Sequence, residues 1–154
     1  MKITEILNKS AIKLDLESVE KEDVLKEMVD VLAELKNIGD KKSIVKALIE
    51  RENLGSTGIG QGIAIPHGKT EKVEELVAIL GISRKGVNFE SLDGELVYIL
   101  FFLVAPKDSA GPHLKALAQI SRLLRDSFFC DLMKRCKTAE EVYELIRKEE
   151  ERKH

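Results

Sequence analysis

The sequence predicts an α/β domain, a single-domain sandwich in which helices flank both faces of a mixed parallel and antiparallel sheet. Two segments, 76–83 and 96–105, are nearly continuous runs of branched apolar residues, as expected of strands covered on both faces. Before and after them, apolar residues recur at helical spacing. Packing such helices on both sides of one sheet is the economical layer arrangement.

Length, composition and charge limit the classes of function. The chain has 154 residues, 44% of them apolar, which suits one domain with a sizeable core. Its 25 basic and 27 acidic residues nearly cancel, so nucleic acid and anionic membranes are disfavoured as partners. The N-terminus lacks an apolar core of signal-peptide length, and the longest apolar run is too short to cross a bilayer. We therefore expect a cytoplasmic protein that is not inserted into a membrane.

In the first third of the chain, the pattern predicts an edge strand and two helices. Residues 12–16 alternate apolar and charged side chains, as an edge strand does. Ser18 is the expected cap of a helix that stops at 37–39, and Asp40 is the expected cap of a second helix. That second helix ends at Arg51-Glu52, just before a glycine-rich segment.

The segment 55–69, GSTGIGQGIAIPHGK, is the most informative part of the chain. Residues 63–65 are expected to form a short buried strand, with His67 at its exit. Pro66 fixes its own backbone φ angle and Gly68 frees the next turn, so the imidazole is carried on a rigid support.

Turns are expected at Lys85-Gly86 and Asp93-Gly94 in the second half, and a loop from Pro106 to Pro112. Helices are expected over 113–125 and 128–136, followed by a last helix with a Thr138/Glu141 capping box that frays into a charged tail at 147–154. Cys130 and Cys136 lack CxxC spacing, so we assign them no role.

Two nucleotide-binding motifs fail on spacing. From Gly62 to Gly68, five residues separate the glycines where a P-loop has four, and Pro66 removes an amide that such a loop would offer. The glycines at 58, 60 and 62 do not form GxGxxG, and they lead into a strand where a dinucleotide site needs a helix.

The chain has three histidines, and His154 lies in the tail. His67 and His113 lie in or beside expected loops, where neutral imidazole can act as a nucleophile near pH 7. A structural role for each is the alternative, and metal binding is weakly supported because no further ligand spacing surrounds them.

A phosphoryl group on His67 would need donors for its oxygens. Arg51, His113 and the backbone amides of a glycine-rich set could supply them, namely Thr57, Gly58, Gly60 and Gly62. For Arg51 the alternative is a solvated cation paired with Glu50 or Glu52, and Ser56 and Thr57 could be simple turn residues.

Together these motifs resemble the fructose/mannitol-type enzyme IIA domain of the bacterial phosphoenolpyruvate-dependent phosphotransferase system (PTS EIIA type 2). They are Arg51-Glu52, STGIGQGIAIPHGK at 56–69, Leu92-Asp93-Gly94, and His113-Leu114 at the start of a helix. The resemblance covers roughly residues 3–146, which we take as the core of a single domain over 1–154. It implies a mixed sheet flanked by helices, in agreement with the pattern.

The resemblance implies a phosphocarrier with a phosphohistidine intermediate. Phospho-HPr would donate its phosphoryl group to His67, and a cysteine on a IIB domain or a IIB/IIC permease would receive it. His113 matches the histidine that helps to hold the phosphoryl group, and Arg51 matches the arginine beside it. No cofactor and no metal is implied. The family precedent favours attack by Nε2, with Nδ1–H held by a hydrogen bond.

Two branches of the family remain open, and the chain's sugar is unspecified. One branch feeds a fructose/mannitol-type sugar permease; in the other, a nitrogen-type regulatory EIIA, the phosphohistidine controls binding to partner proteins. The segment from Phe89 to Ser121 looks closer to the fructose type. We also expect apolar side chains such as Ile59 and Ile63 to ring the histidine as a transient docking surface. A binding module with an inactive site is a third, disfavoured alternative.

Overall fold

The computed structural model describes residues 1–152, and these form one six-stranded sheet with six helices. In chain order the elements are α1 (Ile3–Ile6), β1 (Leu7–Lys13), α2 (Lys21–Lys36), α3 (Lys41–Asn53), β2 (Gly58–Gly60), β3 (Ile63–Ala64), β4 (His67–Lys69), β5 (Val77–Val87), β6 (Val97–Ala105), α4 (Ala110–Leu124), α5 (Ser127–Arg135) and α6 (Ala139–Arg152).

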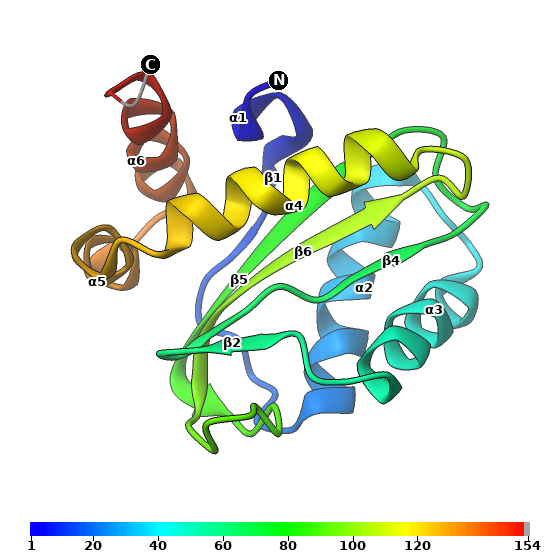
Figure 1. Cartoon of the computed structure of the whole chain (residues 1–154), viewed down its shortest axis with the longest axis horizontal. Coiled ribbons are helices and arrows are strands. Elements are labelled where there is room, and N and C mark those ends of the chain that lie inside the picture. Colours follow the sequence, from blue (N-terminus) through cyan, green and yellow to red (C-terminus); the bar gives the residue numbers. More distant parts are fainter. Residues whose placement is uncertain (153–154) are drawn as a thin grey trace.

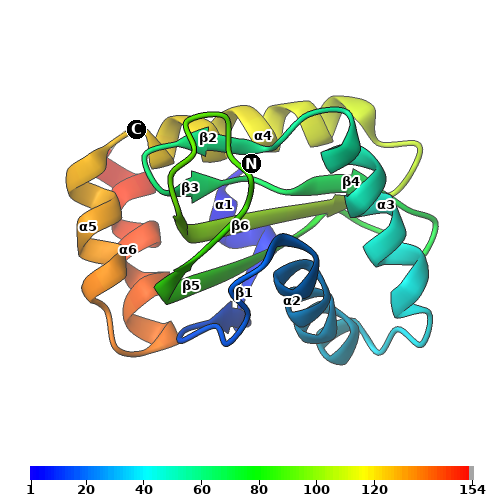
Figure 2. The same cartoon turned by 90° about the horizontal axis from the view of Figure 1, so that it is seen from below.

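The sheet is mixed and covered on both faces, which confirms the expected fold class. Its order is β1-β5-β6-β3-β2; β1 and β3 run parallel to their neighbours β5 and β6, whereas the β5–β6 and β2–β3 pairs are antiparallel. Figure 1 shows α4, α5 and α6 on one side of the sheet and α2 and α3 on the other. Figure 2 shows the strand order from β2 at one edge to β1 at the other.

The central strands β5 and β6 form the middle of the core because nearly every side chain along them is buried. β6 has two short parallel partners in succession. Ile63 and Ala64 of β3 lie opposite Ile99 and Leu100, and further along β6 His67 of β4 lies opposite Leu103. The core of the sheet therefore fixes the backbone on which His67 is carried.

The N-terminal strand lies earlier than expected. It spans Leu7–Lys13 instead of 12–16, although it is an edge strand as expected. Ser18 does not cap α2; the cap position is Glu20, which makes no side-chain hydrogen bond. The backbone amide of Ser18 instead donates to the carboxylate of Glu27 at 3.0 Å. In contrast, the expected cap of α3 is confirmed, because Asp40 accepts from the amide of Ser43 at 3.1 Å.

An expected turn lies within a strand, and an expected loop lies partly within a helix. Lys85-Gly86 is not a turn but an irregularity within β5, where the pairing with β6 shifts register between Ile82 and Val87. The loop expected from Pro106 to Pro112 ends early, because α4 begins at Ala110. Proline is compatible with the first turn of a helix, where amide groups lack intrahelical partners.

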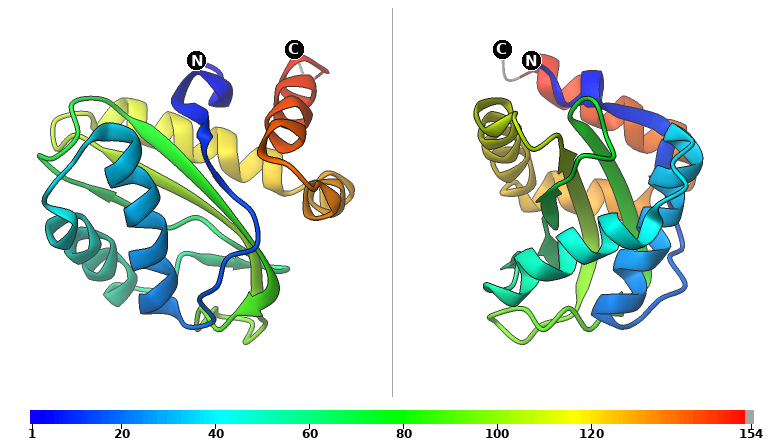
Figure 3. Two further views of the ribbon diagram at one scale, coloured as in Figure 1. Left: turned by 180° about the vertical axis from the view of Figure 1, so that it is seen from behind. Right: turned by 90° about the vertical axis from the view of Figure 1, so that its right-hand side faces the viewer.

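The C-terminal segment is part of the fold as far as it is described. The Thr138/Glu141 contact is confirmed, with the Glu141 amide donating to Thr138 Oγ1 at 3.1 Å. α6 does not fray at 147 but continues to Arg152, and it packs beside α1 near the chain ends (Figure 3). The last two residues of the expected tail, 153 and 154, lie outside the described residues, and His154 is one of them.

Candidate functional site

The last turn of α3 presents Arg51 and Glu52 in different directions, as successive helical residues do. Nη1 of Arg51 donates to the carbonyl oxygen of Gly55 at 2.8 Å. The alternative pairing with Glu50 or Glu52 is not observed: Glu52 pairs with Lys21, and the carboxylate of Glu50 lies 4.0 Å from Lys46 Nζ. Nη1 of Arg51 thus stabilises the turn after the helix. No other hydrogen bond of this guanidinium is present among residues 1–152.

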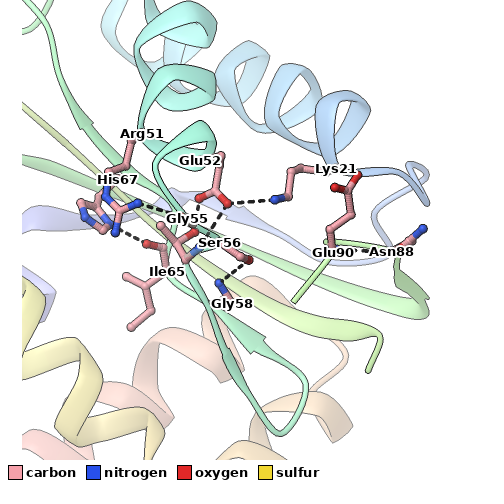
Figure 4. A network of polar contacts seen from close by, with 11 residues as sticks. Lys21, Arg51, Glu52, Gly55, Ser56, Gly58, Ile65, His67, Asn88 and Glu90 are labelled. Carbon is pink, nitrogen blue, oxygen red and sulfur yellow. Dashed lines mark hydrogen bonds and ion pairs between the residues drawn. The ribbon is translucent and has the colours of Figure 1, made fainter. Parts of the chain in front are cut away.

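Glu52 is a buried carboxylate at the centre of a polar network, drawn in Figure 4. Its Oε1 accepts from the Thr57 amide and from Lys21 Nζ, both at 3.1 Å, and its Oε2 accepts from the Thr57 hydroxyl. Sequence reasoning treated Glu52 only as a partner for Arg51. Lys21 begins α2, thirty-one positions away, so no local pattern indicated the pair.

The glycine-rich segment forms the β2–β3 hairpin, in which three positions favour glycine for steric reasons. A Cβ atom on Gly58 would lie 2.2 Å from Ser91 Oγ, so only glycine allows this approach. Gly60 and Gly62 have φ angles of +90° and +81°, which other residues rarely adopt.

Two of the four expected amide donors are already engaged within the chain. The Thr57 amide donates to Glu52, and the Gly58 amide donates to Ser56 Oγ at 3.0 Å. The expectation that the amides of Thr57, Gly58, Gly60 and Gly62 face a phosphoryl group stays a prediction.

His67 begins β4 instead of following a strand into an open loop, and its ring is half-buried. Nδ1 lies 2.8 Å from the carbonyl oxygen of Ile65. Because a carbonyl only accepts, the proton of the neutral ring belongs on Nδ1. Nε2 then carries the lone pair, which is the arrangement that a nucleophilic imidazole needs.

The ring of His113 lies against the ring of His67. His113 lies in the first turn of α4, which begins at Ala110 and not at 113 as expected, and only 5% of its surface is exposed. The two imidazole rings are 5.5 Å apart between centroids and nearly perpendicular, at 79°. Nε2 of His113 is buried and has no hydrogen-bond partner among residues 1–152, so a polar group is left available beside His67.

Burial is the main cause of a lowered pKa at both histidines. For His67, burial lowers the pKa from 6.5 and outweighs the Ile65 hydrogen bond, which raises it; the charge of Arg51 lowers the pKa further, and the charge of Glu52 raises it. For His113, burial, His67 and Lys69 all lower the pKa. Both rings are therefore neutral near pH 7, the state in which Nε2 of His67 can attack an electrophile.

Apolar side chains are exposed next to these residues in the chain. Ile59 is 50% exposed and Leu114 is 67% exposed, whereas Ile63 is buried at 4% and cannot contribute to the expected docking surface. Leu54, three residues after Arg51, is 85% exposed. Exposed leucines beside a cluster of polar groups are typical of a surface that meets other proteins.

Residues 1–152 contain no cluster of three or more histidine, cysteine, aspartate or glutamate side chains placed to hold a metal ion. In the same range, no helix has the length and apolar character needed to span a membrane. Both cysteines are free, and burial raises the pKa of the Cys130 thiol to about 11. A thiol with so high a pKa is a poor nucleophile near pH 7.

Residues 5–149 match the family described as "Phosphoenolpyruvate-dependent sugar phosphotransferase system, EIIA 2". The chain is 46% identical over 124 residues to the fructose-specific EIIABC component of Bacillus subtilis. That match covers 80% of this chain but only 20% of the relative, so the chain spans about a fifth of that protein's length.

Other relatives match along nearly their whole length. The chain is 36% identical to a nitrogen regulatory protein of Bradyrhizobium diazoefficiens, over 95% of each protein. The crystal structure of the nitrogen regulatory protein IIA-Ntr from Neisseria meningitidis superposes with a TM-score of 0.86 at 32% identity, over 94% of this chain and 98% of that one.

Proposed function

The chain belongs to the EIIA 2 family of the phosphoenolpyruvate-dependent sugar phosphotransferase system, and from that premise we propose that it is a phosphocarrier with His67 as its acceptor. In this proposal phospho-HPr donates the phosphoryl group, and a IIB domain, free or within a IIB/IIC permease, receives it. The transfer takes place in the cytoplasm and requires neither a nucleotide nor a metal cofactor.

The observation that carries the proposal is the hydrogen bond from His67 Nδ1 to the Ile65 carbonyl. It leaves Nε2 as the nucleophilic atom of a neutral ring. Two groups lie near that ring. Nε2 of His113 is buried and has no hydrogen-bond partner among the described residues, and the guanidinium of Arg51 donates one hydrogen bond, to Gly55. A nucleophile accompanied by hydrogen-bond donors and a cation is what phosphoryl transfer requires.

The transfer is written as an in-line exchange between two nitrogen atoms. The lone pair on His67 Nε2 attacks the phosphorus atom of phospho-HPr, a new N–P bond forms, and the N–P bond to the donor's imidazole breaks. The electron pair of that bond stays on the donor nitrogen. The proton stays on Nδ1 of His67, hydrogen-bonded to the Ile65 carbonyl oxygen, throughout the step, so the ring needs no tautomer change before or after it.

Arg51 and His113 hold the equatorial oxygens of the phosphoryl group in this proposal. The guanidinium supplies positive charge, and His113 donates from Nε2 once a phosphoryl oxygen gives it a partner. The glycine amides at 58–62 contribute further donors where they are not already engaged. In the next transfer, the thiolate of a IIB cysteine attacks phosphorus, and the electrons of the N–P bond return to Nε2.

We favour the sugar-uptake branch because the fructose-specific relative is 46% identical over the matched region. The nitrogen-type regulatory branch is a second candidate with its own observation in favour, since those relatives match along nearly their whole length and one superposes with a TM-score of 0.86. In that branch the phosphohistidine controls binding to partner proteins, and no sugar is phosphorylated.

The proposed acceptor is tested by mass spectrometry of the intact protein after incubation with phosphoenolpyruvate, enzyme I and HPr. Wild-type protein should gain one acid-labile phosphoryl group, and His67→Ala should gain none. His113→Ala serves as the matched control: it should be folded and accept the group more slowly. A folded wild type that stays unmodified while HPr is phosphorylated would refute the proposal.

To distinguish the two branches, a fructose-type IIB domain is added to the phosphorylated protein, and the masses of both proteins are measured by mass spectrometry. In the sugar branch the phosphoryl group moves to the IIB cysteine. Retention of the group on the chain, with no transfer to IIB, would favour the nitrogen-type branch.

A further inference from the structure

We infer that Glu52, paired with Lys21, is a positioning residue that sets the orientation and the proton location of the His67 ring. The inference rests on the proposed role of His67 for its kinetic consequence, but its geometry is independent of that role. Glu52 touches neither imidazole; it acts through the backbone that carries His67.

A continuous path of hydrogen bonds connects Lys21 to the His67 ring, and Figure 4 shows most of its members. Lys21 Nζ and the Thr57 amide both donate to Glu52 Oε1 at 3.1 Å. The Thr57 carbonyl accepts from the Ile65 amide at 3.0 Å, and the Ile65 carbonyl accepts from His67 Nδ1 at 2.8 Å. The Ile65 carbonyl oxygen, which accepts the hydrogen bond from Nδ1, is thus linked to the Glu52 carboxylate through the backbones of Ile65 and Thr57.

The carboxylate of Glu52 is buried among its hydrogen-bond partners. Glu52 is 7% exposed, and the Lys21 side chain is 16% exposed and lies over the Phe89 ring, with Nζ 4.7 Å from its centroid. A buried carboxylate that lacked the ammonium group and the two Thr57 donors would be strongly destabilising. The pair therefore anchors the start of β2 to two helices at once, α2 through Lys21 and α3 through Glu52.

The same pairing decides what Arg51 can do. Arg51 and Glu52 are neighbours in the chain, and a lone carboxylate so close would attract the guanidinium. Because Lys21 and Thr57 satisfy Glu52, Arg51 donates to the neutral carbonyl of Gly55 and keeps its charge for an anionic group. Among the charged groups near the two rings, Glu52 raises the pKa of His67 and Arg51 lowers it, while His67 and Lys69 of β4 lower the pKa of His113.

The test compares Glu52→Gln with a control of the same chemistry elsewhere. Glu27 also accepts two backbone amides and a lysine, but it lies on α2 beside β1, at the sheet edge opposite β2. Nitrogen-15 NMR of the His67 ring reports the tautomer and the pKa, and mass spectrometry reports the rate of phosphorylation by phospho-HPr. Urea unfolding of each variant shows that the folded state is being measured.

In Glu52→Gln we expect a lower His67 pKa, a larger share of the tautomer protonated on Nε2, and phosphorylation slowed by roughly 10–100-fold, by analogy with a metal-binding histidine that loses its outer hydrogen-bond partner. Glu27→Gln should lose stability without changing the His67 pKa or tautomer. Lys21→Met should raise the His67 pKa, because it leaves the negative charge uncompensated, and Lys21→Met/Glu52→Gln should return the pKa toward that of the wild type.

The His67 pKa should fall in Glu52→Gln and rise in Lys21→Met if the charges of the pair act on the ring. General loosening of the fold would shift the His67 pKa in the same direction in both variants. The inference is overturned if Glu52→Gln leaves the His67 tautomer and pKa unchanged, or if both single variants shift the pKa alike. Failure of the proposed function would look different: the folded wild type would stay unmodified, or His67→Ala would still be phosphorylated. The NMR comparison would decide the role of Glu52 in either case.

Discussion

Burial sets the charge state of His67 and His113 more than any single neighbour does. A buried imidazole binds a proton less readily than one in water, because the cation loses hydration. The two rings also face each other at 5.5 Å, so a proton on one opposes a proton on the other. At the scale of the residue, the site therefore keeps both imidazoles neutral near pH 7.

This burial predicts a pH dependence of stability. Both folded pKa values lie below the ordinary 6.5, so the unfolded chain binds protons first as the pH falls. The free energy of unfolding should therefore decrease as the pH falls from about 7.5 to about 5.5. A histidine whose pKa is one pH unit lower in the folded state than in the unfolded state contributes at most about 1.4 kcal/mol to this decrease. Urea unfolding of the wild type and of His113→Gln should show a shallower decrease in the variant.

The carboxylates provide a separate check of this prediction. Glu27 has a pKa of about 2, below its ordinary 4.5, so the stability that it contributes is lost only as the pH falls below 4.5. The Glu27→Gln variant should consequently keep the wild-type slope between about pH 7.5 and about pH 5.5. An unchanged slope in His113→Gln would contradict the assignment to the histidines.

At the scale of the element, several local signals were predictable, although the Ser18 cap was not one of them, and the long-range ones were not. The Asp40 cap is confirmed by its bond to the Ser43 amide, and the helix stop at Asn37 is a left-handed residue with φ of 55°. Both depend on residues within one helical turn. The β5 irregularity at Lys85-Gly86 depends on the pairing with β6, which a turn-like dipeptide does not reveal.

The site shows the same division. Arg51, His67 and His113 were identified from the motifs, and the structure brings the two imidazoles together with Arg51 at the end of α3 nearby. Glu52 was missed as a network centre because its partner Lys21 is remote in sequence and its burial is a tertiary property. The helix that carries His113 was expected to start at 113 but starts at Ala110, because Pro112 fits within the first turn of α4.

The β2 strand gives a prediction at this scale. In Gly58→Ala, the new methyl group would lie 2.2 Å from Ser91 Oγ and 2.9 Å from Ser91 Cβ, so the strand must move. Such overpacking should lower the free energy of unfolding by about 1–3 kcal/mol. Urea unfolding measures the loss.

Removing the opposing side chain should relieve the strain. Ser91→Gly combined with Gly58→Ala should recover most of the stability lost by Gly58→Ala, as measured in a double-mutant cycle against Ser91→Gly alone. Ser91→Ala should be nearly neutral by itself, since Ser91 Oγ is buried without a partner among the described residues. Additive losses in the cycle would show that Ser91 is not the obstacle.

At the scale of the whole molecule, the site exists only where distant parts of the fold meet. Arg51 arrives from α3 on one side of the sheet, His113 from α4 on the other, and His67 from a short strand that pairs with the central β6. Small movements of these layers would separate the groups, so the contacts that hold the layers together matter for the site as well as for stability.

The two ends of the chain are joined by one buried carboxylate, and this contact supplies the last prediction. Glu150 of α6 accepts from the amides of Ile3 and Thr4 and from the Thr4 hydroxyl, and it is 9% exposed. Its charge thus satisfies amide groups of the first turn of α1 that have no partner within the helix. Glu150→Gln should lower the free energy of unfolding by about 1.5–3 kcal/mol, the range for hydrogen bonds to a charged group.

The neighbouring Glu151 is the matched control, because it is exposed and pairs with Arg147 at 2.8 Å. Glu151→Gln should change stability by less than about 0.5 kcal/mol. Hydrogen exchange should quicken at residues 3–6 in Glu150→Gln only, while phosphorylation of the folded protein stays at the wild-type rate because α1 contributes no residue to the site. Equal stability of the two variants would mean that the contact between the chain ends is dispensable, and that α1 is held to the fold by the burial of Ile3 instead.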